Sequence, residues 1–104
     1  MSLDFMASKN QKKIDENTPV FSLKKVEHEQ IFDYVNSLKK YPIISKCNDY
    51  YSDATILYGE IKEMIIELRE VVKLNGLKLE FITYFISFLK SAFERGDNIY
   101  VYCD

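Results

Sequence analysis

Two long amphipathic segments, separated by only two residues, constrain this chain more than any other feature. Over residues 56–74 and again over 77–95, apolar side chains recur every three or four positions, with charged residues between them. Gly76 and Gly96 follow the two segments, and glycine favours the left-handed conformation that ends many helices. The pattern therefore predicts two helices joined as an antiparallel hairpin. It also places Glu67 on the charged, solvent-facing side of the first helix.

The remaining segments predict a third helix and a small sheet. Residues 27–38 follow a helical period, and Pro42 prevents that helix from continuing. Residues 97–104 alternate, with Ile99, Val101 and Cys103 on one side and tyrosines on the other, which is typical of a strand with one buried face. We expect this strand to pair with residues 20–23 or 43–45. The result is an α+β fold in which three helices pack on a small sheet that includes the C-terminal strand.

The length of 104 residues fits one domain. Residues 1–18 are polar and show no period, and residues 1–5 look partly like a cloning leader. We therefore expect a disordered or tag-like tail over 1–18 and a single α+β domain over 19–104.

The charge balance limits the classes of partner. A formal net charge of −2 argues against a nucleic-acid binder, which normally presents a strongly basic face. There is no signal-peptide pattern, and the apolar runs are too short to span a membrane. We therefore expect a cytoplasmic protein with no membrane partner, in which Cys47 and Cys103 remain reduced.

The sequence carries no recognisable catalytic pattern. His28, flanked by Glu27 and Glu29, is expected to face water, without the orienting partner and nucleophile that a general base needs. Three Cys and His residues at wide spacing do not make a structural zinc site, and the isolated glycines make no phosphate loop. We expect no enzyme activity, no metal and no cofactor. Crowded carboxylates acting on a metal or a proton are the less favoured alternative.

Tyrosines and acids in and beside residues 47–55 and the last strand are the most informative polar feature. Tyrosine is enriched in protein interfaces, and acids would steer a basic partner towards them. The same rings could instead fill the domain's own core. The predicted partner-binding residues are Asp49, Tyr50, Tyr51, Asp53, Glu60, Asp97, Tyr100 and Tyr102.

The second half of the chain resembles small bacterial immunity proteins of polymorphic-toxin and contact-dependent inhibition systems. The matching segments are DATILYGEI at 53–61, IIEL at 65–68, the aromatic helix that ends at Ala92, and NIYVYCD at 98–104. The resemblance implies a cytosolic inhibitor that binds one cognate toxin and blocks its action, and it supplies no catalytic residues. The modest net charge differs from that of strongly acidic nuclease inhibitors and disfavours a nuclease partner. The alternative is a homodimeric structural or regulatory domain that pairs its copies through a free edge near residues 99–103.

Overall fold

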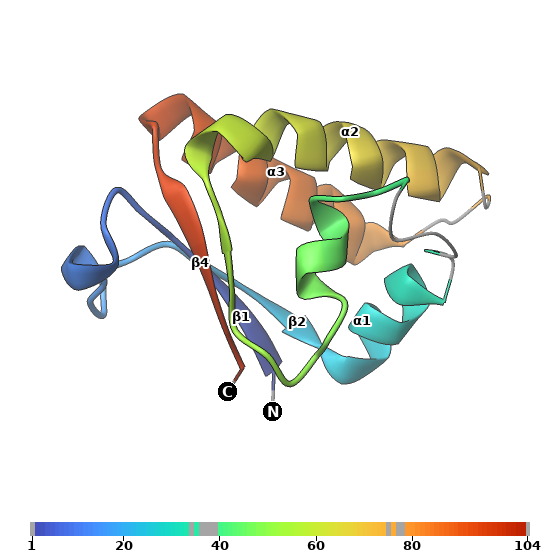
Figure 1. Ribbon diagram of the computed structural model, residues 1–104, viewed down its shortest axis with the longest axis horizontal. Coiled ribbons are helices and arrows are strands. Elements are labelled where there is room, and N and C mark those ends of the chain that lie inside the picture. Colours follow the sequence, from blue (N-terminus) through green and yellow to red (C-terminus); the bar gives the residue numbers. More distant parts are fainter. Residues whose placement is uncertain (1, 34, 36–39, 75, 77–78, 104) are drawn as a thin grey trace.

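An antiparallel sheet with helices packed on one face forms the fold of the computed structural model (Figure 1). The structure describes residues 2–33, 35, 40–74, 76 and 79–103. Its strands are β1 (Ser2–Ser8), β2 (Val20–Lys24), β3 (Ala54–Ile56) and β4 (Asn98–Cys103). Its helices are α1 (Lys25–Phe32), α2 (Tyr58–Leu74) and α3 (Glu80–Arg95), with short 3-10 helices η1 (Gln11–Lys13) and η2 (Ile44–Cys47). The predicted α+β class, with three helices and a sheet containing the C-terminal strand, is confirmed.

The N-terminal segment is a central strand of the sheet. The strand order is β2-β1-β4-β3, so β1 pairs on both sides. Leu3, Phe5 and Ala7 are buried, and the residues between them face the other side. The prediction that residues 1–18 form a tail outside the domain is therefore wrong. In β1, apolar side chains that are buried alternate with side chains on the other face. This period of two is typical of a strand with one solvent-facing side, and the polar residues between the apolar ones made the segment look like a tail.

The C-terminal strand alternates as predicted, but its neighbours differ from those expected. Ile99 and Val101 are buried, and β4 pairs with β1 on one side and β3 on the other. Residues 20–23 do form a strand, which pairs with β1 instead. Residues 44–47 form the 3-10 helix η2. Self-pairing was expected through a free edge near residues 99–103, but residues 99–101 of β4 already pair on both sides within the monomer.

The helical hairpin lies on one face of the sheet, with α2 and α3 side by side and running in opposite directions (Figure 1). Gly96 has a φ of 76° and its N–H bonds back to the last turn of α3, so it ends that helix as predicted. The third helix is shorter than predicted. It begins at Lys25 and ends at Phe32, and positions 34 and 36–38 lie outside the described residues.

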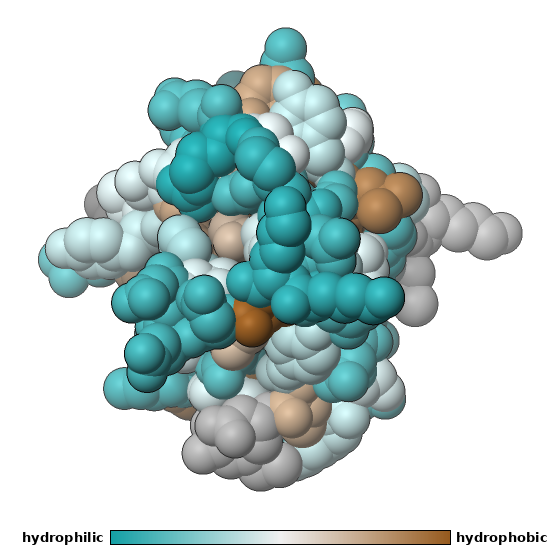
Figure 2. Space-filling view, turned by 90° about the vertical axis from the view of Figure 1, so that its left-hand side faces the viewer, coloured by the Kyte–Doolittle hydropathy of each residue, from teal (hydrophilic) through white to brown (hydrophobic). Residues whose placement is uncertain are grey.

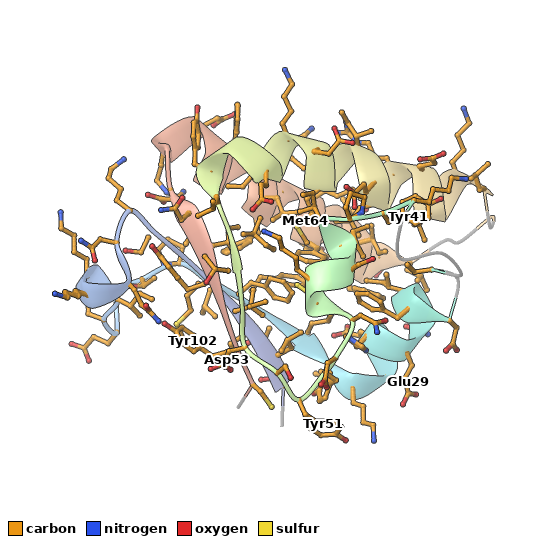
Figure 3. All side chains as sticks on the ribbon, viewed as in Figure 1. Glu29, Tyr41, Tyr51, Asp53, Met64 and Tyr102 are labelled. Carbon is orange, nitrogen blue, oxygen red and sulfur yellow. The ribbon has the colours of Figure 1, made fainter. Side chains whose placement is uncertain are left out.

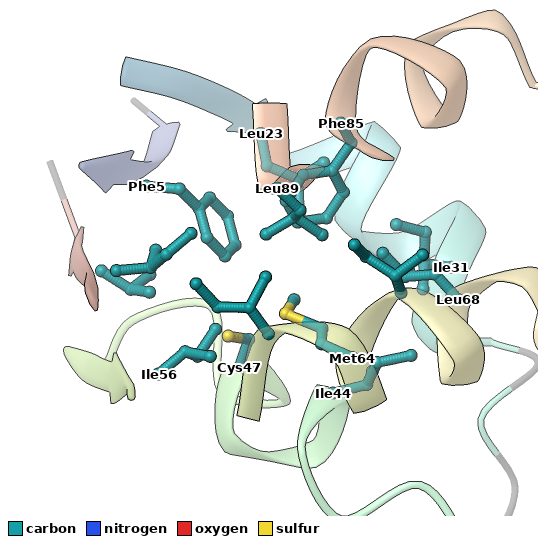
Figure 4. Close-up of a cluster of buried hydrophobic side chains, with 14 of the residues drawn as sticks. Phe5, Leu23, Ile31, Ile44, Cys47, Ile56, Met64, Leu68, Phe85 and Leu89 are labelled. Atoms are coloured by element: carbon teal, nitrogen blue, oxygen red, sulfur yellow. The ribbon is translucent and has the colours of Figure 1, made fainter. Parts of the chain in front are cut away.

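Aromatic rings link the sheet to the hairpin in the core (Figure 4). The ring of Phe85 on α3 stacks on Phe21 of β2 with centroids 4.6 Å apart, and it tilts against Phe5 of β1 at 4.8 Å. Such pairs contribute about 0.5–1.5 kcal/mol beyond the area they bury. The core thus depends on residues from both ends of the chain. No helix in the described part has the length and apolar character needed to cross a membrane.

Candidate functional site

The predicted partner-binding residues lie at four separate places. Asp53, Tyr100 and Tyr102 lie together at the edge of the sheet formed by β3 and β4. Residues 49–51 form the turn after η2, Glu60 lies in the first turn of α2, and Asp97 lies between α3 and β4. Figure 3 shows Asp53 and Tyr102 close to each other, whereas Tyr51 lies apart from them, nearer to α1.

A shallow hollow of about 310 Å³ lies on the sheet face opposite the helices. We call it the sheet-face groove, and its lining residues are Gln11, Asp53, Ala54, Thr55, Tyr100, Val101 and Tyr102. The Gln11 side-chain amide donates to the Tyr102 hydroxyl at 2.8 Å. The Cys103 N–H donates to the Asp53 carboxylate at 3.0 Å. These bonds fix two walls of the groove.

Strand register explains why these side chains meet. Side chains of a strand alternate between faces, so the burial of Ile99 and Val101 directs Tyr100 and Tyr102 outward. Thr55 of β3 pairs with Tyr100. Asp4 of β1 pairs with Tyr102 and also accepts a hydrogen bond from a serine hydroxyl of β2 at 2.7 Å. The side of the molecule on which η1 lies is largely hydrophilic, with a small apolar area near its centre (Figure 2).

The turn after η2 is held by its own hydrogen bonds, and part of it is buried in the core. The Asp49 carboxylate accepts from the Tyr51 N–H at 2.9 Å and from the Ser52 hydroxyl at 2.8 Å, and these bonds lower the pKa of Asp49 below its ordinary value. Tyr50 is 5% exposed, so its ring belongs to the core and cannot meet a partner. Tyr51 is 56% exposed, with the Lys25 ammonium 5.7 Å from its ring centre.

Two of the predicted acids are held by nearby cations. Glu60 pairs with Lys46 at 2.6 Å and accepts a hydrogen bond from the Leu57 N–H at 3.0 Å. The second contact caps the N-terminus of α2. Partial burial opposes ionisation of Glu60, but the bonds from Lys46 and Leu57 lower its pKa overall. Asp97 is 6% exposed and pairs with Arg95 at 2.8 Å. Both acids therefore stabilise the fold, and Asp97 is too buried to meet a partner.

Two buried polar side chains lie where the sequence predicted solvent. Glu67 is 2% exposed, and its carboxylate accepts from the N–H groups of Ile43 and Ile44 at 3.1 and 2.9 Å, at the start of η2. Burial raises its pKa. Helical spacing could have predicted the burial of Glu67, because it lies three residues after Met64 and four before Val71, which are both buried.

His28 is also buried, so the expectation that it faces water is wrong. Its ring stacks on Phe32 with centroids 4.3 Å apart, and its Nε2 lies 2.8 Å from the carbonyl oxygen of Cys47. The imidazole therefore ties α1 to η2. No local sequence pattern predicts this contact, because His28 and Cys47 are 19 positions apart.

No group of three His, Cys, Asp or Glu side chains in the described part of the chain has the geometry to hold a metal ion. Both cysteines are free thiols, and burial raises the pKa of Cys47 to about 12. A thiol with such a pKa is a poor nucleophile at neutral pH.

No protein-family model, curated protein or solved structure matches this chain. The surfaces of this molecule are therefore the basis for inferring its function.

Proposed function

We propose that the protein is a non-enzymatic binding domain of the immunity type, which neutralises a cognate bacterial toxin in the cytoplasm by binding it through the sheet-face groove. The observation that carries this proposal is the open sheet face, where Tyr100, Tyr102 and Asp53 line one hollow. The resemblance of residues 53–61 and 98–104 to immunity proteins supports the same face, because both segments border the groove.

The chemistry of the groove suits a protein partner. Tyrosine rings supply contact area at a small entropic cost, and their hydroxyls can still form a hydrogen bond when the ring is buried. Tyr100 and Tyr102 are both half-buried, so binding would cover the remainder of each ring. The exposed Asp53 carboxylate would favour a basic group of the partner and would act mainly on the rate of association.

The test is co-expression of the tagged protein with the product of the adjacent upstream open reading frame. The proposal predicts a one-to-one complex and rescue of growth from the toxicity of that neighbour. No complex and no rescue would contradict it. A stable homodimer in which the groove residues are covered would instead support the alternative of self-assembly, for which β3 is the edge strand beside the groove.

Two substitutions locate the interface without removing the fold. Thr55→Arg fills the groove from an exposed position and should abolish the complex. Asp53→Asn removes the charge but retains an oxygen that can accept from the Cys103 N–H, so it should weaken binding about fivefold to tenfold. Tyr84→Ala is the matched control, because Tyr84 is 69% exposed on α3, away from the groove. Equal binding by all three variants would exclude this face.

A further inference from the structure

A second concave surface runs along the helical hairpin. Three adjoining hollows, of about 570, 310 and 240 Å³, lie between α2 and α3, and Arg69 borders all three. They therefore form one continuous feature, which we call the hairpin furrow. It shares no lining residue with the sheet-face groove.

The furrow has an apolar floor. Its aliphatic and aromatic lining residues are Ile65, Ile66, Val72, Leu79, Ile82, Ile86 and Phe93. On α2 the lining positions recur at 62, 65, 66, 69, 72 and 73, which is the spacing of one helix face. Ile66 remains 51% exposed at the rim. Two helices that lie side by side with such a floor present a site for a third helix.

The rim of the furrow is predominantly cationic, although the chain as a whole has a net charge of −2. Its charged lining residues are Lys62, Arg69, Lys73, Lys90, Glu80 and Glu94. Among the described residues, none of the four cations lies within 4.0 Å of a carboxylate; the ion pairs found there use Lys9, Lys40, Lys46 and Arg95. The furrow thus holds positive charges that no carboxylate in the described part of the chain neutralises by direct pairing.

We infer that the hairpin furrow binds an acidic amphipathic helix of a partner protein, with apolar side chains on the floor and carboxylates facing Lys62, Arg69, Lys73 and Lys90. Residues 62 and 73 are about 16 Å apart along α2, so the bound helix would span at least three turns. The floor favours this occupant over a nucleic acid, because single strands need aromatic stacking platforms and the floor has only the half-buried Phe93. This surface is independent of the proposed toxin-binding face.

The test uses a stapled synthetic helix of about four turns, with leucines along one face and glutamates on both flanks, because a shorter or unstapled helix would be unstable in water. Amide chemical-shift mapping of the full-length protein should show changes confined to α2 and α3. Replacing the peptide's glutamates by lysines should abolish these changes.

Charge reversal on the protein identifies the contact. Arg69→Glu and, independently, Lys90→Glu should each weaken peptide binding about tenfold, as measured by fluorescence anisotropy. Lys12→Glu is the matched control: it makes the same change in net charge at an exposed residue of η1 and should change affinity by less than about twofold. An unchanged circular-dichroism melting curve for each variant would verify the fold.

Several results would overturn the inference. They are an absence of shifts in the furrow, equal binding of the lysine peptide, or equal losses for Lys12→Glu and Arg69→Glu. Tighter binding of a single-stranded oligothymidine at the same amides would assign the furrow to nucleic acid. Concentration-dependent shifts of these amides without peptide would show that a second copy of the chain covers it.

Discussion

Replacing Glu67 by alanine should destabilise the fold more than any other single change on α2 that leaves its apolar stripe intact. The carboxylate is 2% exposed and accepts from two backbone N–H groups at the start of η2. Alanine leaves both donors without their acceptor, at roughly 1–3 kcal/mol for the buried Ile44 N–H and less for the partly buried Ile43 N–H. Removal of a buried carboxylate, which is itself costly, offsets part of this loss. We therefore expect a net loss of roughly 2–3 kcal/mol in the free energy of unfolding, or roughly 10–20 °C in melting temperature.

Glutamine at the same position separates the hydrogen bonds from the charge. Its side-chain oxygen can still accept from the Ile44 N–H, which Glu67 accepts at 2.9 Å. Glu67→Gln should therefore lose less than about 1 kcal/mol at neutral pH. A loss equal to that of alanine would show that the charge, and not the acceptor oxygen, stabilises η2.

The pH dependence gives a second, independent readout. Burial raises the pKa of Glu67 above its ordinary value of 4.5 in the folded protein, so the folded state holds this proton more tightly than the unfolded chain. The resulting stabilisation is fully present below pH 4.5 and is lost as pH rises through the raised folded-state pKa. Glutamine does not titrate, so the difference in stability between Glu67→Gln and the wild type should change in favour of the variant over that interval.

The assay is urea unfolding followed by far-ultraviolet circular dichroism, from pH 4 to pH 7, for the wild type and both variants. Glu63→Ala, at an exposed residue one turn earlier on α2, is the control for loss of a carboxylate and should change stability by less than about 0.5 kcal/mol. Equal stability of Glu67→Ala and Glu63→Ala would refute the capping role of Glu67.

Three further outcomes follow from the structure. In folded protein at pH 8, iodoacetamide should label Cys103. Cys47 should react only after urea unfolding, because burial raises its pKa to about 12. Mass spectrometry counts the adducts, and rapid labelling of both cysteines in folded protein would contradict this packing. Phe85→Ala should cost about 3–5 kcal/mol in urea unfolding, since its ring stacks on Phe21 at the junction of sheet and hairpin, and a loss below about 1 kcal/mol would contradict that contact. Deletion of residues 2–8 should abolish cooperative unfolding, because β2 would lose the strand it pairs with and β4 would lose one of its two neighbours. A variant that melts like the full chain would restore the tail interpretation.

The sequence by itself determined the elements that depend on local periodicity. The apolar repeats over 56–74 and 77–95 predicted α2 and α3, and Gly96 ends α3 in the left-handed conformation as expected. Alternation over 97–104 predicted β4 and its buried face. These features are readable because residues three, four or two positions apart decide which side of an element is apolar.

The sequence could predict only part of the candidate site. Alternation in β4 was enough to direct Tyr100 and Tyr102 outward together. It did not reveal that Asp53 joins them through the Cys103 N–H, or that Tyr50 and Asp97 are buried. The prediction grouped all of these as one patch because it relied on residue type and on closeness in the sequence.

Only the tertiary structure decided which segments meet. The pairing of β1 with β4 joins residues 3–8 to residues 98–103, across almost the whole chain, and it turns a segment that reads as a polar tail into the centre of the sheet. The same long-range packing buries His28 against Cys47 and Glu67 against η2. Local periodicity reports which face of a segment is apolar, but the partner of that face depends on contacts between distant residues that form only when the core is assembled.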